Sequence, residues 1–243
     1  MKVLKFDIGG QNAFFKNPEL NIALEVTYEH IPKTTILGIL GAIIGLKGRM
    51  QERELGYIEW WKELKDVKVA IVPFQSKFRK FIDKSTNATG FANKDGMNQI
   101  ITRQYLENPK WTIFIQSQNI KKELWDKLVS NLKEYTSEYP IYLGQTSHRA
   151  IIENVEFIDI DMIDNYEEIE HCESILKYSD IYEVENEKYD EAKDRIFKRI
   201  DYMPIALNEL SMYKIEKFVL TNCYISVNNG IFFRYKDLII SFI

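Results

Sequence analysis

The order of strand and helix patterns in the first 155 residues limits the fold most strongly. Period-two alternation and β-branched content predict strands, and apolar spacing of three and four predicts helices. The predicted strands are residues 2–8, 23–28, 67–74, 111–117 and 139–145, and the clearest helix is residues 121–135. With a helix after Pro32, the order is β–α–β–arm–β–α–β. We therefore predict an α+β fold on the split βαβ, ferredoxin-like plan, with an insertion.

The helix after Pro32 carries three glycines, although glycine costs about 1 kcal/mol relative to alanine inside a helix. We predict that Thr34 or Thr35 caps this helix and that it runs to about Gly48. Its apolar stripe consists of Ile36, Ile39, Leu40, Ile43 and Leu46. The spacing of Gly38, Gly41 and Gly45 places them on a common face, which would let the sheet or another backbone approach closely. Residues 57–64 are expected to continue as helix.

Residues 75–110 differ in composition from the segments on either side. They hold seven basic and three acidic residues, and their middle, "DKSTNATGFANKDGMN", is rich in loop-forming residues. We predict a protruding β-hairpin arm inserted between two strands.

The two parts of the chain differ in charge. Residues 1–155 hold 22 basic and 17 acidic residues, a net charge of +5, whereas residues 156–243 hold 10 and 19, a net charge of −9. This difference indicates two regions with different partners, although an acidic run is also typical of a solvated surface. We predict an RNA-binding region at 1–157 and a smaller C-terminal region at 158–243. The latter is expected to be helical around 186–200 and to end in antiparallel strands with turns at 228–230 and 236–237.

Bulk composition excludes several classes of protein. The chain has 243 residues, 45% of them hydrophobic, and a net charge of −4. Two cysteines provide no disulfide framework, so we expect a reduced, cytoplasmic protein. The apolar run 36–46 has 11 residues, against roughly 20 needed to cross a bilayer. The N-terminus alternates like a strand and lacks the apolar core of a signal peptide.

Catalytic and metal motifs are weak. The spacing around Gly41, Gly45 and Lys47 does not fit a phosphate-binding P-loop, and these residues lie within the predicted helix. The three histidines show no paired metal spacing. His148 beside Arg149 is the best candidate for metal-independent RNA cleavage, but a hydrogen-bonding role fits it better. We predict no catalytic residue, no metal and no cofactor.

Two segments carry donors suited to phosphates, sugars and base edges. Lys33, Thr34 and Thr35 lie at a helix start, where free backbone N–H groups favour anions, although ordinary capping would also explain them. Residues 142–155 place Gly144, Gln, Thr, Ser, His and Arg in a polar connection, which could equally be an exposed turn.

Taken together, these segments resemble the CRISPR-associated protein 5 family, in particular its type I-B members. The residues that carry the resemblance are "TYEHIPKTTILGILGAIIGL", the basic arm ending in "ITRQYLENPKWTIFIQ", and "YPIYLGQTSHRAIIENV". The match spans residues 1 to about 157. The resemblance implies an RRM-like domain with a thumb-like hairpin, here about 75–110. The aromatic stacking signature of RRM domains is absent from the predicted sheet strands.

The resemblance also implies a function. Such a subunit caps the end of a type I (Cascade) surveillance complex and holds the 5′ handle of the guide RNA. It contacts the family 7 backbone subunit through the thumb and also contacts the family 8 large subunit. The RNA-binding residues implied here are Lys33, Thr34, Thr35, Lys77, Arg79, Lys80, Arg103, Gln145, His148 and Arg149. Subtype I-C relatives cleave precursor RNA, so endoribonuclease activity is the alternative. No convincing Tyr–Lys–His set occupies matching positions in this sequence.

Overall fold

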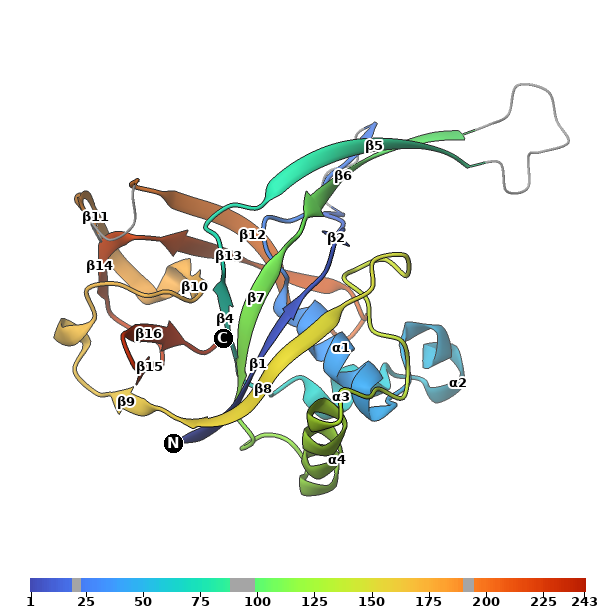
Figure 1. The fold of residues 1–243 in the computed structure, drawn as a ribbon, viewed down its shortest axis with the longest axis horizontal. Helices are drawn as coiled ribbons and strands as arrows, with labels where there is room; N and C mark the ends of the chain where they lie inside the picture. The colour runs from blue at the N-terminus through green and yellow to red at the C-terminus, as the bar shows by residue number, and fades with distance from the viewer. Residues whose placement is uncertain (19–22, 88–98, 190–194) are drawn as a thin grey trace, which may run out of the picture.

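A four-stranded antiparallel sheet lies at the centre of the molecule (Figure 1). Its strands are β4 (Val69–Pro73), β7 (Lys110–Ile115), β1 (Lys2–Gly9) and β8 (Ile151–Asp159), in that spatial order. Each neighbouring pair is antiparallel, for example Phe6 opposite Ile113. The computed structural model describes residues 1–18, 23–87, 99–189 and 195–243.

Helices lie together on one side of this sheet (Figure 1). They are α1 (Lys33–Ile44), α2 (Glu52–Leu55), α3 (Glu59–Leu64) and α4 (Lys122–Lys133), with a 3-10 turn η1 (Arg49–Gln51) before α2. The predicted helices at 57–64 and 121–135 are thus confirmed, with shorter bounds. Within the described ranges, no helix combines the length and apolar character needed to cross a membrane.

Alternate residues of the central strands enter different cores, which explains their almost continuous apolar sequence. Leu4, Ile71 and Ile113 belong to the core shared with α1 and α4. On the opposite face, Ala70 and Phe114 pack against side chains from the last strands, in a cluster that also holds Val3, Ile158, Ile160, Phe233, Ile240 and Phe242. Both faces of the sheet therefore bury apolar side chains.

Helix α1 begins and ends earlier than predicted. Its first residue is Lys33 and its N-cap is Pro32, with no side-chain cap, so the prediction of a threonine cap was wrong. It ends at Gly45, which adopts φ = 84°, a left-handed conformation that glycine tolerates best. The expectation that the helix reaches Gly48 was therefore also wrong.

The glycine face of α1 packs against a helix rather than against the sheet. A Cβ added to Gly41 would lie 2.5 Å from the Cβ of Trp60 in α3. Gly38 faces the same indole at a more open position, where an added Cβ would be 4.0 Å from Trp60 Cε2. The apolar stripe, including Leu40 and Ile43, enters the main core as predicted.

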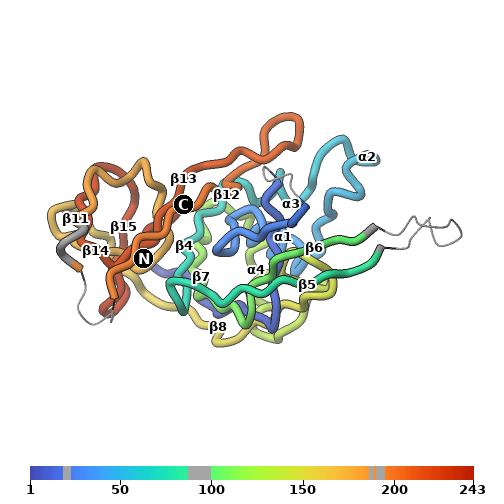
Figure 2. Tube along the Cα trace, turned by 90° about the horizontal axis from the view of Figure 1, so that it is seen from above, coloured from blue at the N-terminus to red at the C-terminus, as the bar shows by residue number. Residues whose placement is uncertain are grey.

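The basic arm forms an antiparallel strand pair, β5 (Arg79–Asn87) with β6 (Gln99–Glu107). The pair extends away from the body (Figures 1 and 2). The middle of the predicted loop, 88–98, lies outside the described residues. At the base, β2 (Asn12–Ala13) and β3 (Leu24–Glu25) also pair with β6. The strand predicted at 23–28 is reduced to these two residues of β3.

The C-terminal region is made of short antiparallel sheets. They are β10 (Leu176–Lys177), β13 (Tyr213–Thr221) and β12 (Lys198–Leu207); β11 (Ile181–Tyr189) and β14 (Cys223–Val227); and β16 (Leu238–Ser241), β15 (Phe232–Tyr235) and β9 (Asp161–Ile163). Two further 3-10 turns, η2 (Tyr166–Glu168) and η3 (Tyr178–Asp180), connect them. The turn at 236–237 joins β15 to β16 as predicted.

Three predictions about secondary structure fail. The helix expected around 186–200 is wrong in the described residues, because β11 and β12 occupy both its ends. Residues 228–230 do not close a hairpin, since β14 pairs with β11 whereas β15 pairs with β9 and β16. Residues 139–145 do not form a strand beyond an isolated Tyr142–Arg149 bridge, and β8 completes the central sheet instead.

Candidate nucleic-acid interface

The segment 139–150 is a tight loop held against the start of the chain. Leu143 N–H donates to His148 O at 2.7 Å, and Ala150 N–H donates to Ile141 O at 3.1 Å. Gly144 adopts φ = 81°, and an added Cβ would overlap the carbonyl oxygen of Phe14. Only glycine fits this close approach, so the loop's shape follows directly from the sequence.

A groove of about 500 Å³ lies between this loop and α1. Its lining includes two predicted site residues, Thr34 and Thr35, together with Gly144. The other lining residues are Gly38, Ile39, Ala42, Leu46, Lys47, Gly48, Arg49, Met50, Gln51, Trp60, Tyr139, Pro140, Ile141, Tyr142 and Tyr213. The structure therefore brings the predicted helix start and the predicted loop to one surface.

The groove combines cations with aromatic rings. Lys47 and Arg49 are exposed, and Tyr139, Tyr142 and Tyr213 are each 40–47% exposed. No acidic side chain is among its described lining residues. Backbone-tracking cations and stacking aromatic rings together are typical of surfaces that bind single-stranded nucleic acid.

Lys33 does not belong to this groove. Its side chain is 7% exposed, and burial, with the nearby charges of Lys68 and Lys177, lowers the pKa of Lys33 to about 8. Thr34 is also buried, with its edge reaching the groove. The helix start therefore offers the groove threonine side chains but not the lysine charge expected there.

The predicted cations of the arm lie at the base of the β5–β6 hairpin, and three of them already have carboxylate partners. Arg103 Nε lies 2.6 Å from Glu25, Lys80 Nζ lies 2.5 Å from Glu29, and Arg79 Nε lies 3.1 Å from Glu107. The bond with Glu25 raises the pKa of Arg103. Arg79 nevertheless stays 83% exposed, and Lys77 is also exposed. These last two cations are the ones best placed to meet phosphates.

An aromatic cluster joins the hairpin base to the loop. Tyr105 of β6 packs edge-on against His148, with ring centroids 5.1 Å apart, and contacts Phe14 and Phe81 at 5.4 and 5.3 Å. Burial and then the charge of Arg103 lower the pKa of His148. The loop residues Gln145 and His148 are half-buried, whereas Arg149 is exposed. The loop thus lies between the hairpin base and the groove.

The histidines do not assemble a catalytic group. His30 is 3% exposed, and burial lowers its pKa to about 4. His171 lies 3.5 Å from Glu173, far along the chain from the loop. The described residues contain no group of three or more His, Cys, Asp or Glu side chains able to hold a metal ion.

Sequence reasoning proposed none of the groove's four aromatic residues and neither of its cations as site residues. These residues are Lys47, Arg49, Trp60, Tyr139, Tyr142 and Tyr213. A usable signal was the run "YTSEYPIY", which places three tyrosines in eight residues ahead of Gly144.

Comparison with known families gives one match. The model described as CRISPR-associated protein (Cas_Cas5) matches residues 3–214. No curated protein matches the chain.

Solved structures of similar fold also come from CRISPR systems. A chain of a "CRISPR RNA-guided surveillance complex" is 13% identical with a TM-score of 0.52, covering 92% of this chain and 91% of that one. A CRISPR protein from Archaeoglobus fulgidus is 12% identical with a TM-score of 0.47, covering 99% and 98%. The first likeness shows a shared fold.

Proposed function

Because this chain belongs to the Cas5 family of CRISPR-associated proteins, we propose that it is the guide-RNA-binding end subunit of a type I surveillance complex. In this role it holds the 5′ handle of the guide RNA and does not cleave it. We also propose that it acts in the cytoplasm.

The connectivity of the central sheet supports a ferredoxin-like, RRM-like domain. The chain order β1, α1, β4, β7, α4, β8 and the spatial order β4-β7-β1-β8 match the split βαβ plan. In RRM domains the sheet face stacks bases through aromatic side chains. Here Phe233, Ile240 and Phe242 cover part of that face, so we assign RNA binding to loops and the groove.

The groove between α1 and the 139–150 loop is the observation that carries the proposal. It offers threonine side chains at a helix start, two exposed cations and four aromatic side chains, with no described carboxylate among its lining residues. Cations and N–H groups bind phosphates, and rings accept unstacked bases without demanding a sequence. This chemistry fits a single-stranded handle better than a duplex.

The β5–β6 hairpin supports the assembly part of the proposal. It extends from the body (Figure 2), so its outer part is accessible to a neighbouring subunit. We assign it the thumb role, contacting the family 7 backbone subunit, while its base with Lys77 and Arg79 faces RNA. A second contact, with the family 8 large subunit, completes the proposed set of partners.

Co-purified RNA tests the proposed function. The full chain is co-expressed with the neighbouring genes, the complex is isolated through a tag on this chain, and bound RNA is sequenced. We expect guide RNAs with a common 5′ handle, and replacing both Lys47 and Arg49 by alanine should reduce the RNA recovered per complex. A complex that lacks RNA, or RNA without a common 5′ end, would contradict the proposal.

Catalysis is a separate question that an assay decides. We expect the purified protein to leave labelled repeat RNA intact, with or without divalent metal, because the sequence offers no convincing Tyr–Lys–His set around the half-buried His148. Specific cleavage that disappears in His148→Ala would establish the endoribonuclease alternative instead.

A further inference from the structure

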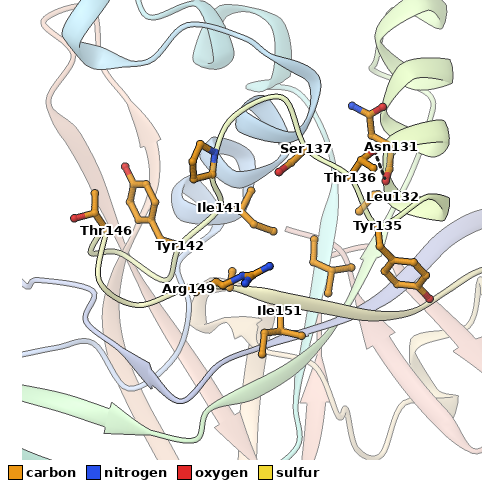
Figure 3. A pocket seen from close by; sticks show the side chains of 13 residues that line it. Asn131, Leu132, Tyr135, Thr136, Ser137, Ile141, Tyr142, Thr146, Arg149 and Ile151 are labelled. Carbon is orange, nitrogen blue, oxygen red and sulfur yellow. Dashed lines mark hydrogen bonds between the residues drawn. The ribbon is translucent and has the colours of Figure 1, made fainter.

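A second pocket, of about 460 Å³, adjoins the groove (Figure 3). The two share Pro140, Ile141 and Tyr142, so these residues form the ridge between them. The remaining lining residues of the pocket are Asn131, Leu132, Tyr135, Thr136, Ser137, Thr146, Arg149, Ala150, Ile151 and Ile152. Its volume falls within the roughly 300–1,000 Å³ that is common for small-ligand sites.

The chemistry of the lining selects a planar, anionic ligand. Tyr135 and Tyr142 lie on opposite sides of Arg149 in Figure 3. None of the ion pairs among the described residues involves Arg149, and the described lining contains no carboxylate. The guanidinium is therefore available to a ligand, and Ile141 and Ile151 add an apolar floor.

Tyr135 has a positive φ angle, which is unusual for a bulky side chain. Thr136 N–H donates to Asn131 O at 2.8 Å and Tyr135 N–H donates to Leu132 O at 3.2 Å, a helix-ending motif in which glycine usually holds the position of Tyr135. Tyr135 adopts φ = 54°, and its side chain is 63% exposed. An exposed ring at a strained backbone position is better explained by binding than by folding.

We propose that this pocket binds one unstacked nucleotide of the guide RNA. The base packs against Tyr135, and Arg149 contacts the adjoining phosphate. The strand reaches the pocket from the groove by crossing the ridge at Tyr142. This inference rests on the proposed function and adds a base-binding subsite to it.

The test uses the full chain and a synthetic handle RNA carrying 2-aminopurine at each position in turn. We expect one position to change its fluorescence on binding. Tyr135→Gly removes the ring and relieves the backbone, so its melting temperature should equal or exceed that of the wild type. Its affinity should fall about 5- to 150-fold, the loss expected for one base–aromatic stack. Tyr135→Phe keeps the ring and should bind within about two-fold of wild type.

Two comparisons separate the possible failures. Arg149→Ala should weaken binding, whereas Tyr182→Ala, at a tyrosine 78% exposed on β11, should not. If wild type binds no handle RNA, the proposed function itself fails. If wild type binds but Tyr135→Gly and Arg149→Ala match it, the base pocket is wrong. If both variants bind RNA like wild type but no longer assemble with the other subunits, the pocket takes a protein side chain. That result also overturns the proposal.

Discussion

At the scale of single residues, two glycines of α1 have different reasons to be glycine. Gly41 leaves room for Trp60, whereas an alanine at Gly38 would meet the same indole at ordinary contact distance. The same substitution at the two positions should therefore have opposite effects on stability.

We predict that Gly41→Ala lowers the free energy of unfolding by about 1–3 kcal/mol, because the new methyl group overpacks the α1–α3 contact. Gly38→Ala should raise it by about 0.5–1 kcal/mol, because alanine is the better helix former. Denaturant unfolding of both variants measures the difference. Equal effects in the same direction would show that Trp60 does not set the requirement for glycine.

The buried His30 makes stability depend on pH. Trp111 Nε1–H donates to its Nδ1 at 3.4 Å, and burial lowers its pKa from 6.5 to about 4. The unfolded imidazole takes up a proton below pH 6.5, whereas the folded one stays neutral until about pH 4. Folded-state stability should therefore fall as pH falls through this window, by up to about 1.4 kcal/mol per pH unit.

His30→Gln removes this titration. Between pH 7.5 and 4.5 the stability advantage of wild type over the variant should shrink by roughly 2–3 kcal/mol, and above pH 7 it should be constant. Urea unfolding at each pH measures the advantage. An advantage that does not change with pH would mean that His30 is protonated equally in both states.

At the scale of elements, the β5–β6 hairpin divides its cations between structure and binding. Lys80 and Arg103 are largely buried in ion pairs with Glu29 and Glu25, whereas Lys77 and Arg79 are exposed. Phosphate contacts release counterions, and cations that are both ion-paired and largely buried have little to offer them, whereas Arg79 stays exposed beside Glu107.

We predict that replacing both Lys77 and Arg79 by alanine reduces the salt slope of handle-RNA binding by roughly 1.4, about 0.7 for each phosphate contact to a single strand. The matched double variant at Lys80 and Arg103 should instead lower the melting temperature, because Glu29 loses its lysine partner and Glu25 keeps only Lys16. Binding measured across a salt series tests both. If the Lys80 and Arg103 variant changes the slope more, these cations leave their glutamates to bind RNA.

Sequence patterns correctly predicted the elements whose signal is local. They failed where strand pairing between distant segments determines the structure. The strands β1, β4 and β7 and helix α4 followed from apolar periodicity, because their buried faces belong to one core. Residues 186–200 are charged and look helical, yet the described ends of this segment lie in β11 and β12, where strand pairing overrides the local propensity. The tyrosine-rich 139–145 segment looked like a strand, but Gly144 turns it back on itself.

The candidate site was predictable only in part for the same reason. Thr34, Thr35 and Gly144 were identified from local donor-rich motifs, and the structure places them on one groove. The burial of Lys33 and the glutamate partners of Lys80 and Arg103 depend on residues distant in sequence. Trp60 and Tyr213 reach the groove from α3 and β13, so no local motif could predict that they line it.

At the scale of the whole molecule, the hairpin and the strands β11, β14 and β15 lie at opposite ends of the long axis (Figure 2). Residues 1–155, which carry the basic excess, include the hairpin end, and the acidic residues 156–243 include the strands at the other end. Under the proposed function, such a separation would let RNA approach the hairpin end while the acidic end would repel it.

The two regions nevertheless share one core. Met203, Phe218 and Leu220 belong to the same apolar cluster as Leu40 of α1. The backbone of Ile243 exchanges two hydrogen bonds with Val69, at 2.9 and 3.3 Å, on the outer strand of the central sheet. Residues 1–157 alone would expose both this strand edge and the apolar face.

We predict that the fragment 1–157 shows no cooperative thermal unfolding, whereas the full chain unfolds in a single transition. The matched control removes residues 84–102 from the hairpin and joins the register partners Asp83 and Arg103 through a two-glycine turn. Because the described residues of that part, 84–87 and 99–102, pair with each other and extend from the body, the control should melt within a few degrees of wild type. Circular dichroism melts compare the three proteins. A fragment 1–157 that melts cooperatively would show that this region folds by itself, with the C-terminal sheets added to a core that is already complete.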